Sequence, residues 1–155
     1  MLCTSSGTPQ DFADPTAGVR AGLADVAVIR TPFDRTGIST LALRSDPVGV
    51  VLRVDDPLAG REVVHMSDVA GRPWFQLPEG TDPVWRAFWN GTKPGGTLRD
   101  GPVVRTIAEC LQGTLWNGTV GMMPMGPESA LAMGYPWDAR APAPRTDSVW
   151  AAQGP

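Results

Sequence analysis

Hydrophobic and polar positions in the first half of the chain form short apolar runs separated by turn residues, a pattern typical of β-strands. Residues 25–30 predict one strand, Thr31 and Pro32 predict a turn, and residues 38–43 predict a second strand. Residues 48–54 predict a third strand, which is apolar enough to lie between two covered faces.

Capping residues predict a short helix just before the first strand. Asp14 is suited to the N-cap and Pro15 to the first helical position. Gly22 supplies the left-handed conformation that ends a helix, so we expect the helix to lie between Asp14 and Gly22.

Two further helices are predicted in the second half of the chain. The first is capped at residues 81–82, carries its aromatic residues on one face, and ends at residues 90–91. The second begins at Thr106, which forms a capping box with Glu109, and ends at residues 117–118. The other predicted elements are a helical turn at 66–69, strands at 73–77, 101–105, 119–123 and 146–152, and a small helix at 127–133.

The composition agrees with many short elements joined by tight turns. The chain has 155 residues, with 18 glycines and 16 prolines, and 42% of its residues are hydrophobic. Strands that alternate with helices indicate the α/β class, and this length fits one globular unit or two small lobes.

The charge pattern argues against direct binding to nucleic acid. The formal net charge is −3, no run of basic residues is present, and Lys93 is the only lysine. The first residues lack the features of a secretory signal, and no stretch is apolar enough to cross a membrane. We therefore expect a cytoplasmic protein without membrane contact.

The residues offer little for catalysis, metal binding or phosphate binding. His65 is the only histidine and no nucleophile elbow accompanies it, while Cys3 and Cys110 show no metal-ligand spacing. We predict no cofactor and no enzymatic activity. The alternative is a small α/β hydrolase or transferase, which needs an activated nucleophile near His65 or a raised pKa in the carboxylate pair at residues 55–56.

Four segments, taken in their order and spacing, resemble the effector-binding domain of LysR-type transcriptional regulators. They are DVAVIRTP (25–32), DPLAGR (56–61), SDVAGRPW (67–74) and the apolar strand at 121–124, within a likeness that covers roughly residues 11–135. The family's turn usually begins with histidine, where this chain has Asp56.

The resemblance implies a two-lobe, periplasmic-binding-protein-like α/β fold with Rossmann-like lobes. Residues 1–46 and 120–155 would form the first lobe and 47–119 the second, with two crossing strands near Ser45 and Gly121. The helix-turn-helix, the linker helix and the opening strand of the first lobe have no counterpart in the sequence. We therefore expect an incomplete first lobe in which strand 25–30 has an unpaired edge, and which is loosened, rearranged or completed by another molecule.

The resemblance also implies a small, anionic metabolite as the effector, bound in the cleft between the lobes. A LysR-type module would reach DNA only through the helix-turn-helix that is missing here, and we expect a homo-oligomer. A third reading is a truncated fragment without function that associates through shared strands. The predicted effector-binding residues are Phe12, Arg30, Thr31, Pro32, Trp74, Phe75 and Thr106.

Each of these effector-binding residues also has a purely structural reading. Arg30 can be an ordinary surface arginine at a strand end, although its guanidinium suits a carboxylate. Adjacent strand residues point to opposite faces, so only one of Trp74 and Phe75 is expected to face a ligand. The capping box already accounts for Thr106, and Phe12 can serve as a staple against the first predicted helix.

Overall fold

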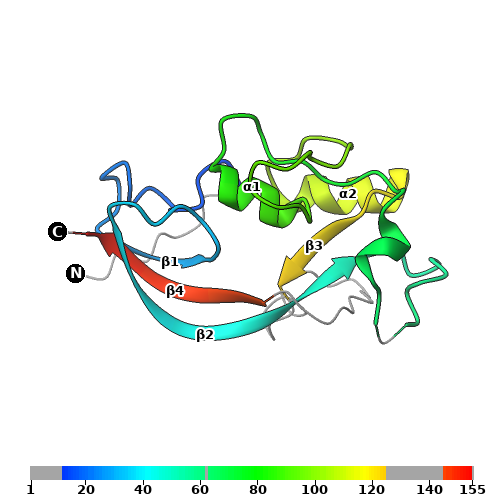
Figure 1. Ribbon diagram of the computed structural model, residues 1–155, viewed down its shortest axis with the longest axis horizontal. Coiled ribbons are helices and arrows are strands. Elements are labelled where there is room, and N and C mark those ends of the chain that lie inside the picture. Colours follow the sequence, from blue (N-terminus) through cyan, green and yellow to red (C-terminus); the bar gives the residue numbers. More distant parts are fainter. Residues whose placement is uncertain (1–11, 62, 125–144, 155) are drawn as a thin grey trace.

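The structure, a computed structural model, describes residues 12–61, 63–124 and 145–154 and has a mixed α/β architecture. Figure 1 shows both α-helices on the same side of two long, curved strands. In chain order the elements are β1 (Val26–Arg30), β2 (Ile38–Val51), the 3-10 helix η1 (Met66–Val69), α1 (Pro83–Trp89), α2 (Ile107–Asn117), β3 (Gly121–Pro124) and β4 (Arg145–Gln153).

One long strand, β2, joins two regions of sheet. The strand order is β1-β4-β2-β3, and every neighbouring pair is antiparallel. Residues 38–47 of β2 pair with β4, whereas residues 48–51 pair with β3. Two isolated parallel bridges lie outside the named strands. One joins Trp74 to Val120, the residue before β3, and the other joins Gln76 to Val103. The expected crossing near residue 45 is therefore the middle of β2.

The buried apolar side chains form two separate clusters, and β2 contributes to both. Ile38, near its start, lies in the first cluster, and Val50, near its end, lies in the second. The first cluster comprises Val19, Ile29, Phe33, Ile38, Val149 and Ala151. The second comprises Val50, Leu52, Leu58, Val64, Val69, Trp74 and Val120.

Local capping explains where the two α-helices begin, as the sequence predicts. The Asp82 carboxylate accepts hydrogen bonds from the backbone N–H groups of Val84 and Trp85 at the start of α1. The Thr106 hydroxyl accepts from the backbone N–H of Glu109 at the start of α2. Gly118, with φ of 62°, ends α2 in the left-handed conformation.

The helix predicted between Asp14 and Gly22 is wrong, because these residues form a series of turns. Asp14 does cap backbone groups, accepting from the N–H of Thr16 and of Gly18. However, Ala17 and Gly18 have φ values of 49° and 83°, which no right-handed helix can accommodate.

Other predicted boundaries also change. The strands expected at 38–43 and 48–54 are one strand, which continues through Pro47 with a bulge between Ala42 and Arg44. The strands expected at 73–77 and 101–105 are reduced to the two isolated bridges. The helical turn at 66–69 and the strands near 121 and 146 are confirmed, while the helix predicted at 127–133 lies outside the described residues.

Strand β1 lies at the edge of the sheet, as expected for an incomplete first lobe. It pairs with β4 over Val26–Arg30, and no other strand of the described residues pairs with its second edge. Val28, in the middle of β1, leaves 49% of its surface exposed. β4 lies between β1 and β2 in the sheet.

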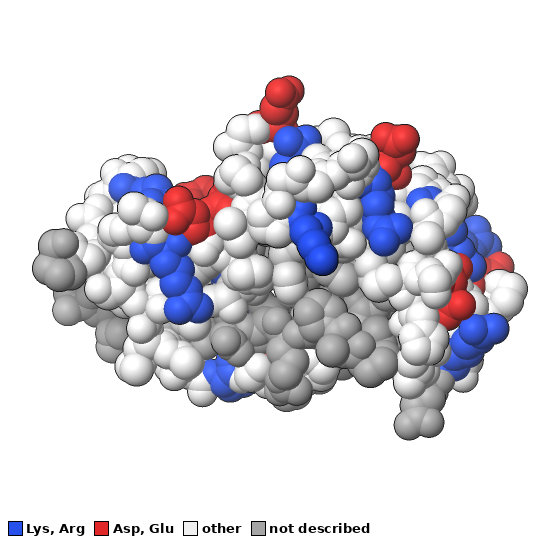
Figure 2. Space-filling view, viewed as in Figure 1, with Lys and Arg blue, Asp and Glu red and all other residues white. Residues whose placement is uncertain are grey.

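The surface shows no concentration of positive charge on the face in Figure 2. Basic and acidic side chains are interspersed there. Within the described ranges, no helix has both the length and the apolar character that crossing a bilayer requires.

Candidate functional site

A buried carboxylate and two arginines meet where β2 passes from the first cluster toward the second. The Nη1 atom of Arg30, at the end of β1, lies 2.7 Å from Oδ2 of Asp46. Both Nε and Nη2 of Arg44 lie 3.0 Å from the same oxygen. The Asp46 side chain is only 8% exposed. We call these three residues the crossover cluster.

The electrostatics of the crossover cluster favour the ionised form of Asp46. Burial raises the pKa of this carboxyl, but hydrogen bonds and charge attraction from Arg30 and Arg44 outweigh that effect and hold the pKa below its usual value of 3.8. Arg30 binds Asp46 through Nη1, and its Nε and Nη2 atoms have no acceptor among the described residues.

A second set of contacts joins Phe12 and the loop after β1 to residues at the amino ends of the two helices. The backbone N–H of Asp34 donates to Oδ2 of Asp82 at 2.7 Å, and the indole N–H of Trp85 donates to the carbonyl of Phe12 at 3.2 Å. The N–H of Phe12 in turn donates to the carbonyl of Arg105 at 2.9 Å. We call these five residues the seam.

We call the part of the molecule around the first cluster the first half and the part around the second cluster the second half. The seam brings these two halves into direct contact. Asp82 uses one carboxylate oxygen to cap α1 and the other to bind the loop that follows β1. Trp85 of α1 also packs against the first cluster, although α1 lies in the sequence between Trp74 and Val120 of the second cluster. Of the predicted effector-binding residues, Phe12 is the one that takes part in the seam.

The predicted effector-binding residues fall into three groups in the structure. Arg30, Thr31 and Pro32 lie at the end of β1, where Thr31 is 6% exposed and precedes Pro32 through a cis peptide bond. Phe12 and Thr106 lie close together, because Phe12 is hydrogen-bonded to Arg105. The third group, Trp74 and Phe75, lies inside the second half of the molecule.

Trp74 and Phe75 are both enclosed by protein. Trp74 is 0% exposed, and its indole N–H donates to the carbonyl of Val69 at 3.1 Å. Phe75 is 7% exposed, and its ring occupies space that a Cβ atom on Gly113 or Gly121 would enter. Burial accounts for both residues as interior packing, so an effector contact by either one stays a prediction.

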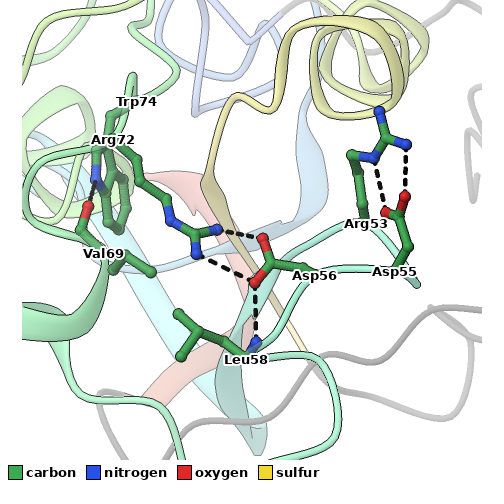
Figure 3. A network of polar contacts seen from close by, with 7 residues as sticks. All are labelled: Arg53, Asp55, Asp56, Leu58, Val69, Arg72 and Trp74. Atoms are coloured by element: carbon green, nitrogen blue, oxygen red, sulfur yellow. Dashed lines mark hydrogen bonds and ion pairs between the residues drawn. The ribbon is translucent and has the colours of Figure 1, made fainter.

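The carboxylates that an enzyme would need are instead engaged by arginines (Figure 3). Arg72 binds Asp56 through both terminal nitrogens, and Asp56 also accepts from the N–H of Leu58 at 2.9 Å. Arg53 binds Asp55 through Nε and Nη2 at 2.8 and 2.7 Å.

These ion pairs set the pKa values of both carboxyls in the direction opposite to the one a general acid requires. The hydrogen bond from Arg72 lowers the pKa of Asp56, and the hydrogen bond from Arg53 lowers the pKa of Asp55. The condition that the hydrolase alternative placed on this pair is therefore not met. His65 is exposed at the start of η1, where its backbone N–H donates to Asp68.

Thiol and metal chemistry gain no support either. Burial, followed by the nearby charge of Glu109, raises the pKa of the Cys110 thiol to about 12, so almost none of it is the reactive thiolate at neutral pH. Across the parts of the chain that the structure describes, no three His, Cys, Asp or Glu side chains are grouped to hold a metal ion.

Sequence reasoning missed the partners in these networks. Asp46 was not a candidate, and Asp82 was assigned only as a helix cap. Arg30 and Asp46 lie sixteen positions apart, as do Arg72 and Asp56, so no local spacing marks either pair. One signal could have drawn attention to Asp56, because it stands where the LysR-type turn usually has histidine.

Comparison with known proteins identifies the family. The family model described as the LysR substrate binding domain matches residues 8–127. The chain belongs to this family. No curated protein sequence matches the chain.

Solved structures agree with the fold of this family. The reduced form of the OxyR regulatory domain from Pseudomonas aeruginosa has a TM-score of 0.64 and 18% identity, covering 88% of this chain and 67% of that one. The effector-binding domain of QuiR in complex with shikimate has a TM-score of 0.64 and 15% identity, covering 88% and 65%. The BenM effector-binding domain with its effector benzoate has a TM-score of 0.62 and 17% identity, covering 89% and 64%.

These likenesses confirm the periplasmic-binding-protein-like α/β class that the sequence predicts. The chain spans about two thirds of the regulatory domains it matches, and 47% of full-length CbnR in its complex with target DNA, which has a TM-score of 0.58 and 15% identity.

Replacing Asp46 with asparagine should destabilise the protein in a pH-dependent way. Because the folded pKa of Asp46 is lowered, the stabilisation by its charge is present above pH 3.8 and is lost as the pH falls through the folded value. Removing one partner from a buried ion cluster costs about 3 kcal/mol. Urea unfolding at pH 7 should show a loss of that order for Asp46→Asn, and the difference from wild type should narrow below pH 3.8.

Asp55→Asn is the matched control, because Asp55 is also paired with an arginine but its side chain is 63% exposed. It should change stability little at any pH. A wild-type advantage over Asp46→Asn that stayed constant down to strongly acidic pH would contradict the assigned role of this carboxylate.

Proposed function

We propose that the chain is the effector-sensing part of a LysR-type regulator and binds a small, anionic metabolite between two lobes. Membership of the LysR substrate binding domain family carries this proposal. Two similar structures contain small carboxylic acids, shikimate with QuiR and benzoate with BenM. The two apolar clusters that β2 connects support a division into two lobes, although Val120 and Met122, which the proposed boundaries of 1–46 and 120–155 against 47–119 place in the first lobe, pack with the second cluster.

The end of β1 is the best-supported part of the effector site. Arg30 has two guanidinium nitrogens without an acceptor among the described residues, and Asp46 fixes the rest of the group. A guanidinium held in this way suits a carboxylate, because less side-chain freedom is lost on binding. Thr31, Pro32, Phe12 and Thr106 would complete the site, and Trp74 and Phe75, which the sequence also predicts as effector contacts, are buried in the second half of the molecule.

The seam suggests how binding would be coupled to a change of shape. Its contacts are a few hydrogen bonds and the packing of Trp85, which an open arrangement would exchange for contacts with water. A ligand that touches both sides of the seam would favour the closed arrangement, by as much as its affinities for the two arrangements differ.

We infer that DNA recognition lies outside the described residues and that the protein works in the cytoplasm. The face in Figure 2 carries interspersed charges, and the formal net charge of the chain is −3, which does not favour binding to a DNA backbone. Coupling to DNA would therefore require a helix-turn-helix in the same polypeptide or in a partner subunit.

Small carboxylates should stabilise the protein, and Arg30 should carry much of the effect. A ligand present at a hundred times its dissociation constant adds about 2.7 kcal/mol. That corresponds to a rise in Tm of roughly 5–10 °C for a domain of this size. The measurement is a thermal-shift screen of a broad carboxylate panel on the wild type and on Arg30→Gln.

The readout of this screen is the ligand-induced rise in Tm, because Arg30→Gln also weakens the crossover cluster. Arg53→Gln is the control, since Arg53 is an exposed arginine paired with Asp55. A folded wild type that no carboxylate in the panel stabilises would count decisively against the sensor role. So would equal shifts in the wild type and Arg30→Gln.

One edge of β1 pairs with no strand of the described residues, and this edge supports association with a second copy of the chain, which is also what the fragment reading requires. An unpaired edge with exposed apolar residues is a template for pairing with another strand. A lysine in the middle of β1, Val28→Lys, should shift the protein toward monomer in size-exclusion chromatography with light scattering. Val103→Lys, at another exposed valine with 58% exposure, should leave the mass unchanged. An unchanged oligomer in Val28→Lys would rule out this edge as the interface.

A further inference from the structure

A depression on the second half of the molecule lies away from the seam. Its volume is about 540 Å³, a size that accommodates small metabolites. The seam is at the carboxyl ends of the bridged segments that contain Trp74 and Val103, whereas the depression is at their amino ends. Its lining residues are Ala70, Gly71, Arg72, Pro73, Leu98, Arg99, Asp100 and Gly101.

Arg99, on the wall of this depression, is held firmly by buried polar neighbours. Its backbone N–H donates to Oδ1 of Asn90 at 2.6 Å, and its carbonyl accepts from Asn90 at 3.2 Å and from Gln76 at 3.1 Å. Asn90 is only 1% exposed. The guanidinium carbon lies 4.9 Å from the centre of the Trp74 ring, so the side chain rests on a fixed aromatic surface.

The guanidinium of Arg99 is fixed but has no polar partner. No described residue accepts a hydrogen bond from it, and its Nε atom is buried without an acceptor. A buried donor without a partner destabilises the folded protein, and an arginine has five donors arranged to bind an oxyanion with two at once. Because Nε is buried and out of reach of a ligand, the two terminal Nη nitrogens of Arg99 are the donors that a ligand in the depression could use.

The other lining residues narrow the ligand class. Arg72 already binds Asp56 through both terminal nitrogens, so Arg99 is the unpaired cation of the lining. Leu98, Pro73 and Ala70 add apolar surface. Asp100 is exposed and brings a negative charge to the rim, which disfavours ligands with several negative charges.

We propose that this depression binds a small organic acid with one carboxylate, which accepts two hydrogen bonds from Arg99 while its apolar body lies against Leu98 and Pro73. This depression is separate from the effector site proposed at the end of β1, and the proposal does not depend on that function. Gly101 is part of the construction, since a Cβ there would lie 1.8 Å from the Trp74 carbonyl oxygen.

The indole signals of a ¹⁵N-labelled sample test this site with local resolution. The chain has 6 tryptophans; the Trp74 signal reports on the depression and the Trp85 signal reports on the seam. Each signal is assigned from its Trp→Phe variant. Titration with butyrate should shift the Trp74 signal saturably, whereas butyramide, which has the same shape without the charge, should not.

Arg99→Gln should weaken the butyrate response of Trp74 at least about tenfold, because the charged two-point contact is lost. Leu98→Glu, which adds a negative charge to the wall, should weaken it as well and serves as a second variant if Arg99→Gln does not fold. Arg53→Gln should leave it unchanged. The proposal would be overturned if the Trp74 signal did not move with butyrate or moved equally with butyramide. It would also be overturned if both Arg99→Gln and Leu98→Glu responded to butyrate as strongly as the wild type. A shift of Trp85 alone would place butyrate at the seam and would also overturn it.

Discussion

The ion cluster at Asp46 and the strand that carries it are the constraint on which the rest of the structure depends. β2 gives its first part to one apolar cluster and its last part to the other, so neither half can fold independently of that backbone. Asp46 lies where the strand changes partners, and two arginines from β1 and β2 hold its carboxylate. A buried carboxylate is tolerated there because two arginines donate hydrogen bonds to it and balance its charge. The same interaction fixes Arg30, and so the position of the proposed effector contact depends on the architecture of the crossing.

The contacts between the two halves differ in kind from the interior of each half. Each cluster consists of buried aliphatic and aromatic residues, whereas the seam consists of three hydrogen bonds and one tryptophan. Hydrogen bonds of this type contribute modestly to stability, because water can replace the partner when the surfaces separate. An arrangement with firm interiors and a modest boundary is suited to a sensor, since a small molecule can supply enough differential binding energy to shift the equilibrium.

Local features of the fold could be predicted from the sequence, whereas long-range features could not. The starts of α1 and α2 follow from Asp82 and Thr106, because a cap acts within a few residues. The helix expected after Asp14 does not form, even though its cap is present. The backbone is left-handed at Ala17 and Gly18, and an alanine does not signal that conformation in a sequence. The order and spacing of four segments were enough to indicate the family. The ion pairs of Asp46 and Asp56 and the enclosure of Trp74 depend on packing between distant segments, which single-sequence patterns do not encode.

Native-state hydrogen exchange along β2 tests most directly whether one strand unites two cores. We expect sheet-bonded amides before and after Pro47 to be strongly protected and to exchange with the same free energy, which equals that of global unfolding. The test is demanding because the edge strand β1 has only β4 as a neighbour among the described residues, so the sheet around residues 38–42 could open more easily than the rest. Rapid exchange in residues 38–42 beside slow exchange in 48–51 would show that the two halves do not share a common folded unit, and would contradict the account.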